Sequence, residues 1–397
     1  MVIRSIAPND SIERYTALGV EVLAGKATLI NPWTVEVALN SGQTQRLTTR
    51  SIVIAAGAQP VVPDVPGMAE GGYVTTDTLW ATLAGMDAIP QRIVLLGGGP
   101  IGCELAQSLA RLGAAVTLVK AAPRLLLRED EDVSAHAEQV LTKEGVLVLT
   151  GHKALRCTSA PKAKSIVVTS GGVEQSLPFD LLICAVGRLA RLTGYGMETL
   201  GISTGRTVQV NGYLQTQYPH IYVAGDAAGP HQFTHMAAHQ AWYAAVNALF
   251  GNFKMFKVDY CLVPHATFMD PEIARVGLNI SQAVSQGVPF EVTRYAMASL
   301  DRAVADGDDS GFVQVLTVPG KDTILGVTVV ASQAGELIAP WVLAMKHGIG
   351  LNRILATIHT YPTLSESTKY AAGVWKRAHQ PTHLLRWAER WHRWRRG

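Results

Sequence analysis

A glycine-rich segment has the spacing G-x-G-x-x-G: Gly97, Gly98, Gly99, Pro100, Ile101 and Gly102. It follows an apolar run at residues 93–96, which is typical of a buried strand, and it opens residues 100–112, which have helical periodicity. Gly97 allows a tight turn, Gly99 lets a phosphate approach the backbone, and Gly102 lets helix and strand pack closely. The free N–H groups at the start of a helix favour an anion. The segment predicts a dinucleotide site; the alternative is a glycine-rich turn without a ligand.

Charged side chains surround this segment. A carboxylate about 20 residues after the glycines would bind the ribose 2′-hydroxyl of NAD, but this chain has Lys120 there, with Arg124 close by. Cations suit a 2′-phosphate, so NADPH is favoured over NADH, unless both side chains are simply solvated. Glu104 is either a first-turn acid stabilised by the helix dipole or a group that reaches the nicotinamide end of the cofactor.

Other residues could bind a ligand or transfer a proton. Asp226 follows Gly225 at the end of a short apolar strand, and such an acid either points into a ligand crevice or caps the next helix. His359 is followed by Glu366, and a carboxylate can fix the tautomer of a histidine that titrates near neutrality. The alternative is a structural histidine. We expect no metal site, since no third ligand is evident near the histidine pair at 235 and 239.

The elements that must position these residues belong to a folded chain of 397 residues, long enough for two to four domains. Hydrophobic residues make up 48% and charged residues 16%, which excludes a disordered chain. A net charge of +3 argues against nucleic acid as the main partner. The sequence shows neither a signal peptide nor an apolar run of about 18 residues, so we expect a cytoplasmic protein. Strand and helix signals alternate over residues 92–187, which predicts a parallel sheet.

The motifs together resemble the pyridine nucleotide-disulphide oxidoreductases, the family of dihydrolipoamide dehydrogenase, glutathione reductase and mercuric reductase. They stand in family order over about residues 10–375: 52–57, 97–104, 185–188, 224–226, 233–239 and 359–366. The resemblance implies an α/β fold with two doubly wound, Rossmann-like, three-layer nucleotide-binding domains, the first incomplete, and an α+β C-terminal dimerisation domain. The implied segments are a partial FAD domain (1–70), an NAD(P)-binding domain (71–190), a second part of the FAD domain (191–256), a dimerisation domain (257–375) and a basic, Trp-rich tail (376–397).

The resemblance also assigns site residues and a reaction, in which a hydride passes from NAD(P)H to FAD and electrons then pass to a dithiol/disulfide or metal-ion acceptor. It implies that His359 is the acid-base residue, that Glu366 orients it, and that the pair serves the partner subunit of an obligate homodimer. The implied NAD(P) contacts are Gly97, Gly98, Gly99, Pro100, Ile101, Gly102, Glu104, Lys120 and Gly187. The implied FAD contacts are Ala55, Ala56, Gly57, Gly225, Asp226, Met236, Ala237, Ala238 and His239.

Two features of the family are missing from the 397 residues: a first glycine loop for the FAD pyrophosphate and a C-x4-C redox pair. Cys103 cannot replace that pair, because it lies in the helix of the glycine loop. We therefore expect a truncated gene model, a fragment or a degraded paralogue with impaired redox chemistry. The alternatives are a dimeric NAD(P)-binding module without redox activity and a protein that acts at a membrane surface.

The tail motivates the membrane alternative. Trp387, Trp391 and Trp394 fall on one face of a helix, and seven Lys and Arg residues between 375 and 397 are opposed only by Glu389. Such a helix either makes weak contact with an anionic membrane surface or packs its Trp face on the dimerisation domain.

Overall fold

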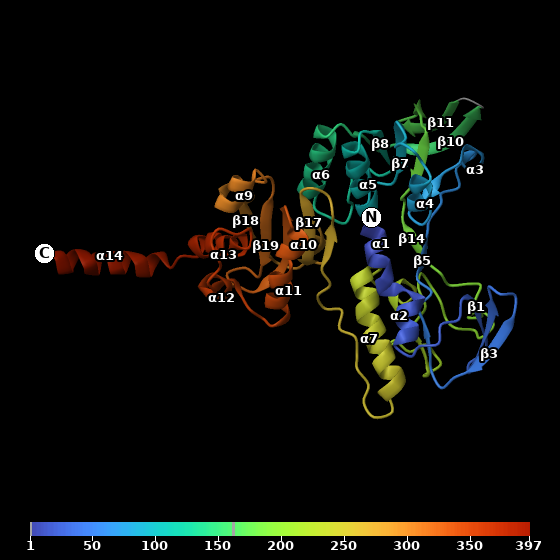
Figure 1. The fold of residues 1–397 in the computed structure, drawn as a ribbon. Coiled ribbons are helices and arrows are strands. Elements are labelled where there is room, and N and C mark those ends of the chain that lie inside the picture. Colours follow the sequence, from blue (N-terminus) through green and yellow to red (C-terminus); the bar gives the residue numbers. More distant parts are fainter. Residues whose placement is uncertain (1, 161–162) are drawn as a thin grey trace. The chain divides into compact units, whose positions relative to one another are not determined.

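The computed structural model describes residues 2–160 and 163–397 (Figure 1). The chain divides into two compact units, and each unit is built from two segments that are distant in sequence. The first unit comprises residues 1–59 and 188–259, and the second comprises residues 60–187 and 260–397.

The described part of the first unit contains three small groups of strands. Three strands form an antiparallel meander: β1 (Gly25–Asn31), β2 (Thr34–Leu39) and β3 (Thr44–Thr48). A parallel pair is formed by β4 (Ile52–Ile54) and β15 (Ile221–Val223), and β5 (Ala58–Pro60) pairs with β14 (Arg188–Ala190). The helices are α1 (Val2–Ile6), α2 (Ile12–Ala17) and α7 (Thr234–Phe250). Ile52 and Ile54 of β4 and Ile221 and Val223 of β15 are buried in one cluster, and this fixes the pair inside the unit.

The predicted parallel sheet is confirmed in the second unit. Its strand order is β6-β13-β7-β8-β9, and each neighbouring pair is parallel. The strands are β6 (Val74–Thr75), β7 (Arg92–Leu96), β8 (Ala115–Lys120), β9 (Leu147–Thr150) and β13 (Leu181–Cys184). The accompanying helices are α3 (Met68–Gly71), α4 (Leu79–Ala84), α5 (Pro100–Arg111) and α6 (Glu131–Lys143). A separate antiparallel sheet contains β10 (Lys153–Ala160), β11 (Ala163–Ser170) and β12 (Val173–Pro178).

Helices α5 and α6 carry the end signals of stable helices. Pro100 stands in the first turn of α5, where its fixed φ favours the helix and its missing N–H leaves no bond unmade. Glu131 and Asp132 lie in the first turn of α6 and Lys143 in its last turn, so the charges oppose the helix dipole.

The C-terminal part of the second unit is built on a five-stranded antiparallel sheet with the order β16-β17-β20-β19-β18. The strands are β16 (His265–Thr267), β17 (Glu272–Gly277), β18 (Glu291–Ala296), β19 (Phe312–Thr317) and β20 (Ile324–Ala331). The helices of this part are α8 (Ile280–Ser285), α9 (Asp301–Asp306), α10 (Ala334–Leu337), α11 (Ala339–Lys346), α12 (Leu351–Ala356), α13 (Glu366–Ala378) and α14 (Thr382–Arg396).

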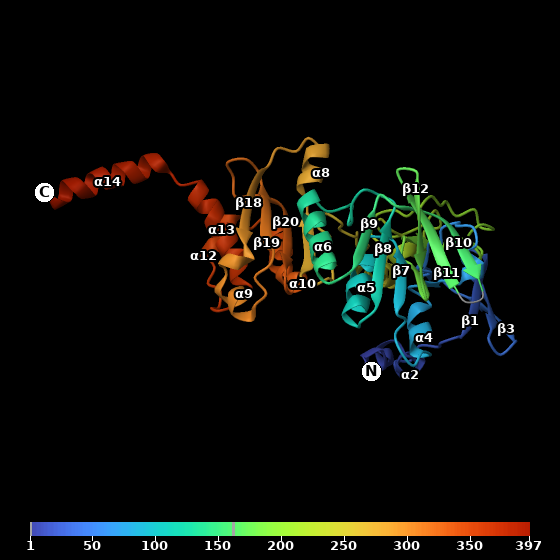
Figure 2. The same cartoon turned by 90° about the horizontal axis from the view of Figure 1, so that it is seen from above.

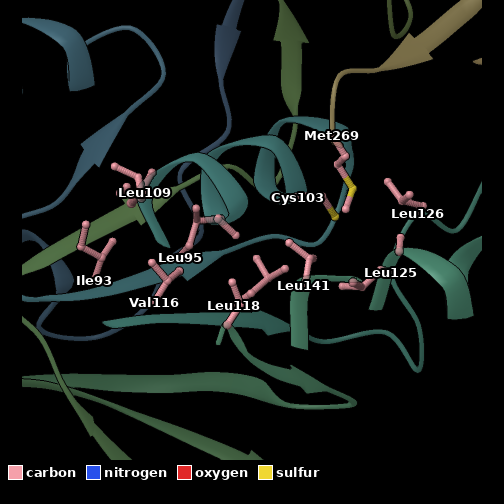
Figure 3. Close-up of a cluster of buried hydrophobic side chains, with 14 of the residues drawn as sticks. Ile93, Leu95, Cys103, Leu109, Val116, Leu118, Leu125, Leu126, Leu141 and Met269 are labelled. Carbon is pink, nitrogen blue, oxygen red and sulfur yellow. The ribbon is translucent and has the colours of Figure 1, made fainter. Parts of the chain in front are cut away.

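Both faces of this antiparallel sheet are covered, and its side chains alternate between them. Along β17, Ala274 and Val276 join the cluster shared with α10, α11 and α13, whereas Ile273 joins the cluster of α5 and α6. Figure 2 shows the sheet between α13 on one side and α6 on the other. The cluster of α5 and α6 also holds Leu95 of β7 and Cys103 of α5 (Figure 3). The parallel sheet and the C-terminal antiparallel sheet therefore share one hydrophobic core.

Among the described residues, no helix is both long and apolar enough to cross a membrane.

Candidate functional site

The glycine segment turns sharply between β7 and α5, and the surrounding backbone explains two of its glycines. Gly97 has φ +115°, and a Cβ added there would lie 2.3 Å from the carbonyl oxygen of Ala185. A Cβ on Gly102 would lie 1.7 Å from the carbonyl oxygen of Gly97. Gly99 differs, because no atom lies within 4 Å of its missing Cβ. Packing thus requires Gly97 and Gly102, while Gly99 leaves open space at the start of α5, where a phosphate can approach the N–H groups.

The segment is held from both sides. The N–H of Gly97 donates to the carbonyl of Val119 at 2.9 Å, and the carbonyl of Gly98 accepts from the N–H of Leu126 at 2.9 Å. Gly187 has φ +143°. It lies two residues after Ala185, whose carbonyl oxygen would be 2.3 Å from a Cβ on Gly97. These bonds fix the cradle before any ligand arrives.

Lys120 and Arg124 differ in their surroundings. Lys120 ends β8, and its Cβ lies 3.3 Å from the position of a Cβ on Gly98. The guanidinium of Arg124 is bound within its own segment: it donates to the Ser134 hydroxyl at 2.6 Å and to the Glu129 carbonyl at 2.9 Å, besides two further carbonyls. Lys120 and Arg124 were both expected near a 2′-phosphate. The bonds of Arg124 hold the loop before α6 in place.

Glu104 binds a partner that neither of its two expected roles includes. Its carboxylate accepts a hydrogen bond from the backbone N–H of Phe268 at 2.9 Å. Burial raises the pKa of Glu104, and the Phe268 bond opposes this increase. One turn further, Gln107 accepts from the N–H of Asp270 and donates to its carbonyl, both at 2.8 Å. The glycine-loop helix is thereby attached to the segment that precedes β17.

The glycine-bearing ends of β4 and β15 lie side by side in the first unit. The N–H of Ala224 donates to the carbonyl of Ile54 at 2.9 Å, so the segment Ala55, Ala56 and Gly57 leaves the sheet beside Gly225 and Asp226. Gly57 has φ +67° with no atom within 4 Å of its missing Cβ. Asp226 lies in a short 3₁₀ turn, while α7 begins at Thr234 with Phe233 as its N-cap residue. Asp226 is therefore not the N-cap of α7.

The start of α7 is attached to this edge. A Cβ on Gly225 would lie 3.3 Å from the Cβ of Ala237. The buried Gln240 accepts from the N–H of Gly225 and donates to the carbonyl of Gly229, both at 2.7 Å. Sequence reasoning missed Gln240, because nothing in the sequence marks its pairing with Gly225 and Gly229. Ala238 and His239 are exposed. An open glycine and a carboxylate at one sheet edge suit the polyol part of a flavin nucleotide.

His359 and Glu366 lie on opposite sides of the loop between α12 and α13. The ring Nδ1 of His359 contacts the carbonyl oxygen of Thr357 at 3.0 Å. The buried carboxylate of Glu366 accepts from the N–H of Thr363 at 3.2 Å and from the hydroxyl of Tyr370 at 3.4 Å. Within the chain that the structure describes, no hydrogen bond joins His359 to Glu366, and Glu366 stabilises the turn before α13.

A tyrosine that sequence reasoning passed over also lies in this loop. The hydroxyl of Tyr361 donates to the carboxylate of Asp301 at 3.2 Å, and this bond raises the pKa of Tyr361. The nearby charge of Glu366 acts in the same direction. The sequence offered no signal for the pairing, because Asp301 is 60 residues away.

The buried cysteines are poor nucleophiles. Burial raises the pKa of Cys103 to about 12, so its thiol stays protonated under ordinary conditions. Cys103, Cys157 and Cys184 are buried and form no disulfide, whereas Cys261 is exposed. Among the described residues, no group of three or more His, Cys, Asp or Glu side chains could hold a metal ion.

Comparisons with known proteins agree with this architecture. Residues 3–245 match the family described as "Pyridine nucleotide-disulphide oxidoreductase". Residues 263–372 match the family's dimerisation domain.

Curated relatives extend the match over most of the chain. It is 31% identical to a mercuric reductase of Staphylococcus aureus over 91% of its length, and it spans 64% of that relative. The chain is 32% identical to a mercuric reductase of Streptomyces lividans, and the match covers 91% of this chain and 76% of that relative. It is 33% identical to a dihydrolipoyl dehydrogenase of Thermus scotoductus, covering 92% of this chain and 77% of that one.

Two solved structures are also similar. LpdA from Mycobacterium tuberculosis matches with a TM-score of 0.82 and 25% identity, over 93% of this chain and 81% of that chain. The HOCl-induced flavoprotein disulfide reductase RclA from Escherichia coli, in its Cu(II) complex, matches with a TM-score of 0.79 and 27% identity, over 88% and 78%. These likenesses confirm the predicted fold class. By its motifs, its fold and these matches, the chain belongs to the pyridine nucleotide-disulphide oxidoreductases.

Proposed function

We propose that this chain supplies the nucleotide-binding and dimerisation parts of an FAD-dependent NAD(P)H oxidoreductase that acts on a dithiol/disulfide or metal-ion acceptor. The observation that carries the proposal is the cradle at Gly99. It lies at the N-terminus of α5, it is open where a phosphate would approach, and it is closed by backbone at Gly97 and Gly102. FAD, when bound, accepts the hydride of the nicotinamide and passes electrons on.

The residues of the chain have separate tasks in this proposal. The first turn of α5 binds the pyrophosphate, and Lys120 binds the ribose end, which favours NADPH. Gly57 and Asp226 bind the polyol part of the flavin nucleotide from the edge of β4 and β15. Ala55 and Ala56 and the start of α7, Met236 to His239, line the same edge.

Proton transfer is assigned to His359. Its Nδ1 is held by the Thr357 carbonyl, which fixes the tautomer and leaves Nε2 to exchange a proton with the acceptor. Glu366 positions this loop through Thr363. Ile358, beside the histidine, is 93% exposed in the single chain, which supports burial of this loop against a second copy. The proposed assembly is a homodimer.

A second candidate is a dimeric NAD(P)-binding module without redox activity. It is favoured by the sequence itself, because the 397 residues contain one G-x-G-x-x-G segment and no C-x4-C pair. We accordingly propose that these residues by themselves support less turnover than the relatives they resemble.

Flavin reduction separates the two candidates. The full chain is mixed with FAD, freed of unbound ligand, and titrated with NADPH and with NADH under anaerobic conditions. The oxidoreductase predicts a retained flavin absorption band that is bleached by the nucleotide. Retention of nucleotide without any flavin band supports the binding module. Failure to bind either NADPH or NADH contradicts both. Light scattering of the same sample tests the homodimer.

A further inference from the structure

The C-terminal helix α14, Thr382–Arg396, contains no buried residue. Trp387, Trp391 and Trp394 are 65%, 40% and 78% exposed, although aromatic side chains of this size are usually covered. The alternative in which these tryptophans pack on the dimerisation domain of their own chain is not what the structure shows. Within the described part of the second unit, these three side chains remain exposed.

The apolar side chains form a continuous stripe. Trp387, Trp391 and Trp394 are spaced by four and three residues, and Leu384 continues the same face one turn earlier. The rings of Trp387 and Trp391 stack with centroids 6.5 Å apart. An indole has an apolar body and one N–H donor, which suits the boundary between lipid headgroups and acyl chains.

The rest of the helix surface is basic. Arg386, Arg390 and Arg393 lie along one flank of the Trp stripe and Arg396 lies opposite it. Glu389 is the one acidic residue of the helix, and it is paired with Arg393. The guanidinium of Arg395 lies over the ring of Trp391 at 4.8 Å, at the border of the two faces. Arginine at that border can bind a phosphate while its stem stays against apolar groups.

The length of the helix decides how it can meet a bilayer. Its 15 residues span about 22 Å, which is shorter than a hydrocarbon core of about 30 Å. Its charges also exclude a position inside that core. A short, strongly amphipathic helix with Trp on one face and Arg on the other lies in the plane of the interface.

We propose that α14 binds the surface of an anionic lipid bilayer, with the Trp stripe inserted among the acyl chains and the arginines bound to lipid phosphates. The charge of the helix selects the anionic surface, and the Trp stripe gives the binding its apolar part. This inference does not depend on the redox chemistry proposed above.

The test is co-sedimentation of the full chain with two kinds of vesicle, phosphatidylcholine alone and equal parts of phosphatidylcholine and phosphatidylglycerol. We expect sedimentation with the anionic vesicles at low salt, a blue shift of Trp fluorescence, and release at high salt. Replacing Trp387, Trp391 and Trp394 together by Ser should abolish sedimentation. Replacing Arg386 and Arg390 by Gln should weaken it at least about tenfold.

Trp80→Ser is the matched control, because Trp80 is also exposed but lies on α4. It should sediment as the unchanged chain does. Thermal unfolding checks that each variant is folded, which is expected because α14 buries nothing. Three outcomes would overturn the proposal: no sedimentation with anionic vesicles, equal binding to both kinds of vesicle, or unchanged binding of the Trp variant. In the case that the unchanged chain does not bind vesicles, light scattering of the Trp variant identifies another occupant. If the variant no longer self-associates, a second copy of the chain covers the stripe.

Discussion

Glu129 and Arg275 form a buried ion pair, with 2.8 Å between the guanidinium Nε and the carboxylate oxygen. Their side chains are 7% and 4% exposed, and the two residues are 146 positions apart in the sequence. Glu129 precedes α6, which lies between β8 and β9 of the parallel sheet, and Arg275 lies on β17. His265 donates to the other carboxylate oxygen at 3.1 Å. The pair thus joins the loop before α6 to the C-terminal antiparallel sheet, where that sheet and the parallel sheet share a core.

Breaking this pair from one side should be costly. Arg275→Leu leaves the Glu129 carboxylate buried without its main cation, so we expect a loss of about 3–5 kcal/mol in the free energy of unfolding. Urea denaturation measures it. The double variant Glu129→Leu with Arg275→Leu is the control, because removing both charges should cost less than removing one. A double variant less stable than Arg275→Leu would contradict this account.

The same pair makes stability depend on acid pH. Burial would raise the pKa of Glu129, but the bonds and charges of His265 and Arg275 outweigh burial and lower it from the ordinary 4.5. A lowered pKa gives stability that is present above 4.5 and is lost as the pH falls through the folded-state pKa. Thermal unfolding of the unchanged chain and of Glu129→Gln should therefore converge below that pH. Parallel curves would show that Glu129 is not the group responsible.

Two glycines of the nucleotide segment should respond differently to alanine. Gly99→Ala places a methyl group in open space, so unfolding free energy should change by less than about 0.5 kcal/mol while NAD(P)H affinity falls at least about tenfold. Gly102→Ala drives a methyl group into the carbonyl of Gly97 and should destabilise the chain by about 1–3 kcal/mol or more. Calorimetry and nucleotide fluorescence titration measure the two effects. If Gly99→Ala binds NAD(P)H as tightly as the unchanged chain does, the phosphate does not bind at Gly99.

Glu104 offers a pH dependence of the opposite sign. Its pKa is raised by burial, so the ionised carboxylate is disfavoured in the folded chain, and its contribution to stability declines as the pH rises above 4.5. Glu104→Gln keeps an acceptor for the Phe268 N–H and removes the charge. The variant should gain stability relative to the unchanged chain between acid and neutral pH. Glu104→Leu should instead lose about 0.5–1.5 kcal/mol, because the Phe268 N–H loses its acceptor.

Nucleotide preference tests the role of Lys120. Arg124 is bound to the loop before α6, so Lys120 is the cation we assign to a 2′-phosphate. Lys120→Asp should weaken NADPH at least about tenfold, roughly 1.4 kcal/mol, and should leave or improve NADH binding. Titration with both nucleotides gives the ratio. An unchanged ratio of NADPH to NADH affinity would show that Lys120 does not bind the ribose end. Arg124→Gln is the control, because it should lower stability without altering this ratio.

The parts that could be predicted from sequence are those with a local pattern. The glycine spacing between an apolar run and a helical period gave β7 and α5, and the C-terminal helix followed from its Trp spacing. Contacts with distant partners could not be predicted. Glu104 finds Phe268 and Gln240 finds Gly225 only once the chain is folded, and no periodicity marks either pair. Arg124 was expected to face a ligand because a charged side chain in a loop gives no sign that its carbonyl partners are nearby.

The alternation of side chains along β17 limits how far this family can be recombined. Arg275 faces Glu129, while its neighbours Ala274 and Val276 face the opposite cluster. Next to this pair, Asp130 accepts from the N–H groups of Ile280 and Ser281 at 3.1 and 2.9 Å. A chimera that took its C-terminal sheet from one relative and its nucleotide-binding half from another would have to transplant the acids at 129 and 130 together with their partners. In this chain the two halves form one matched set.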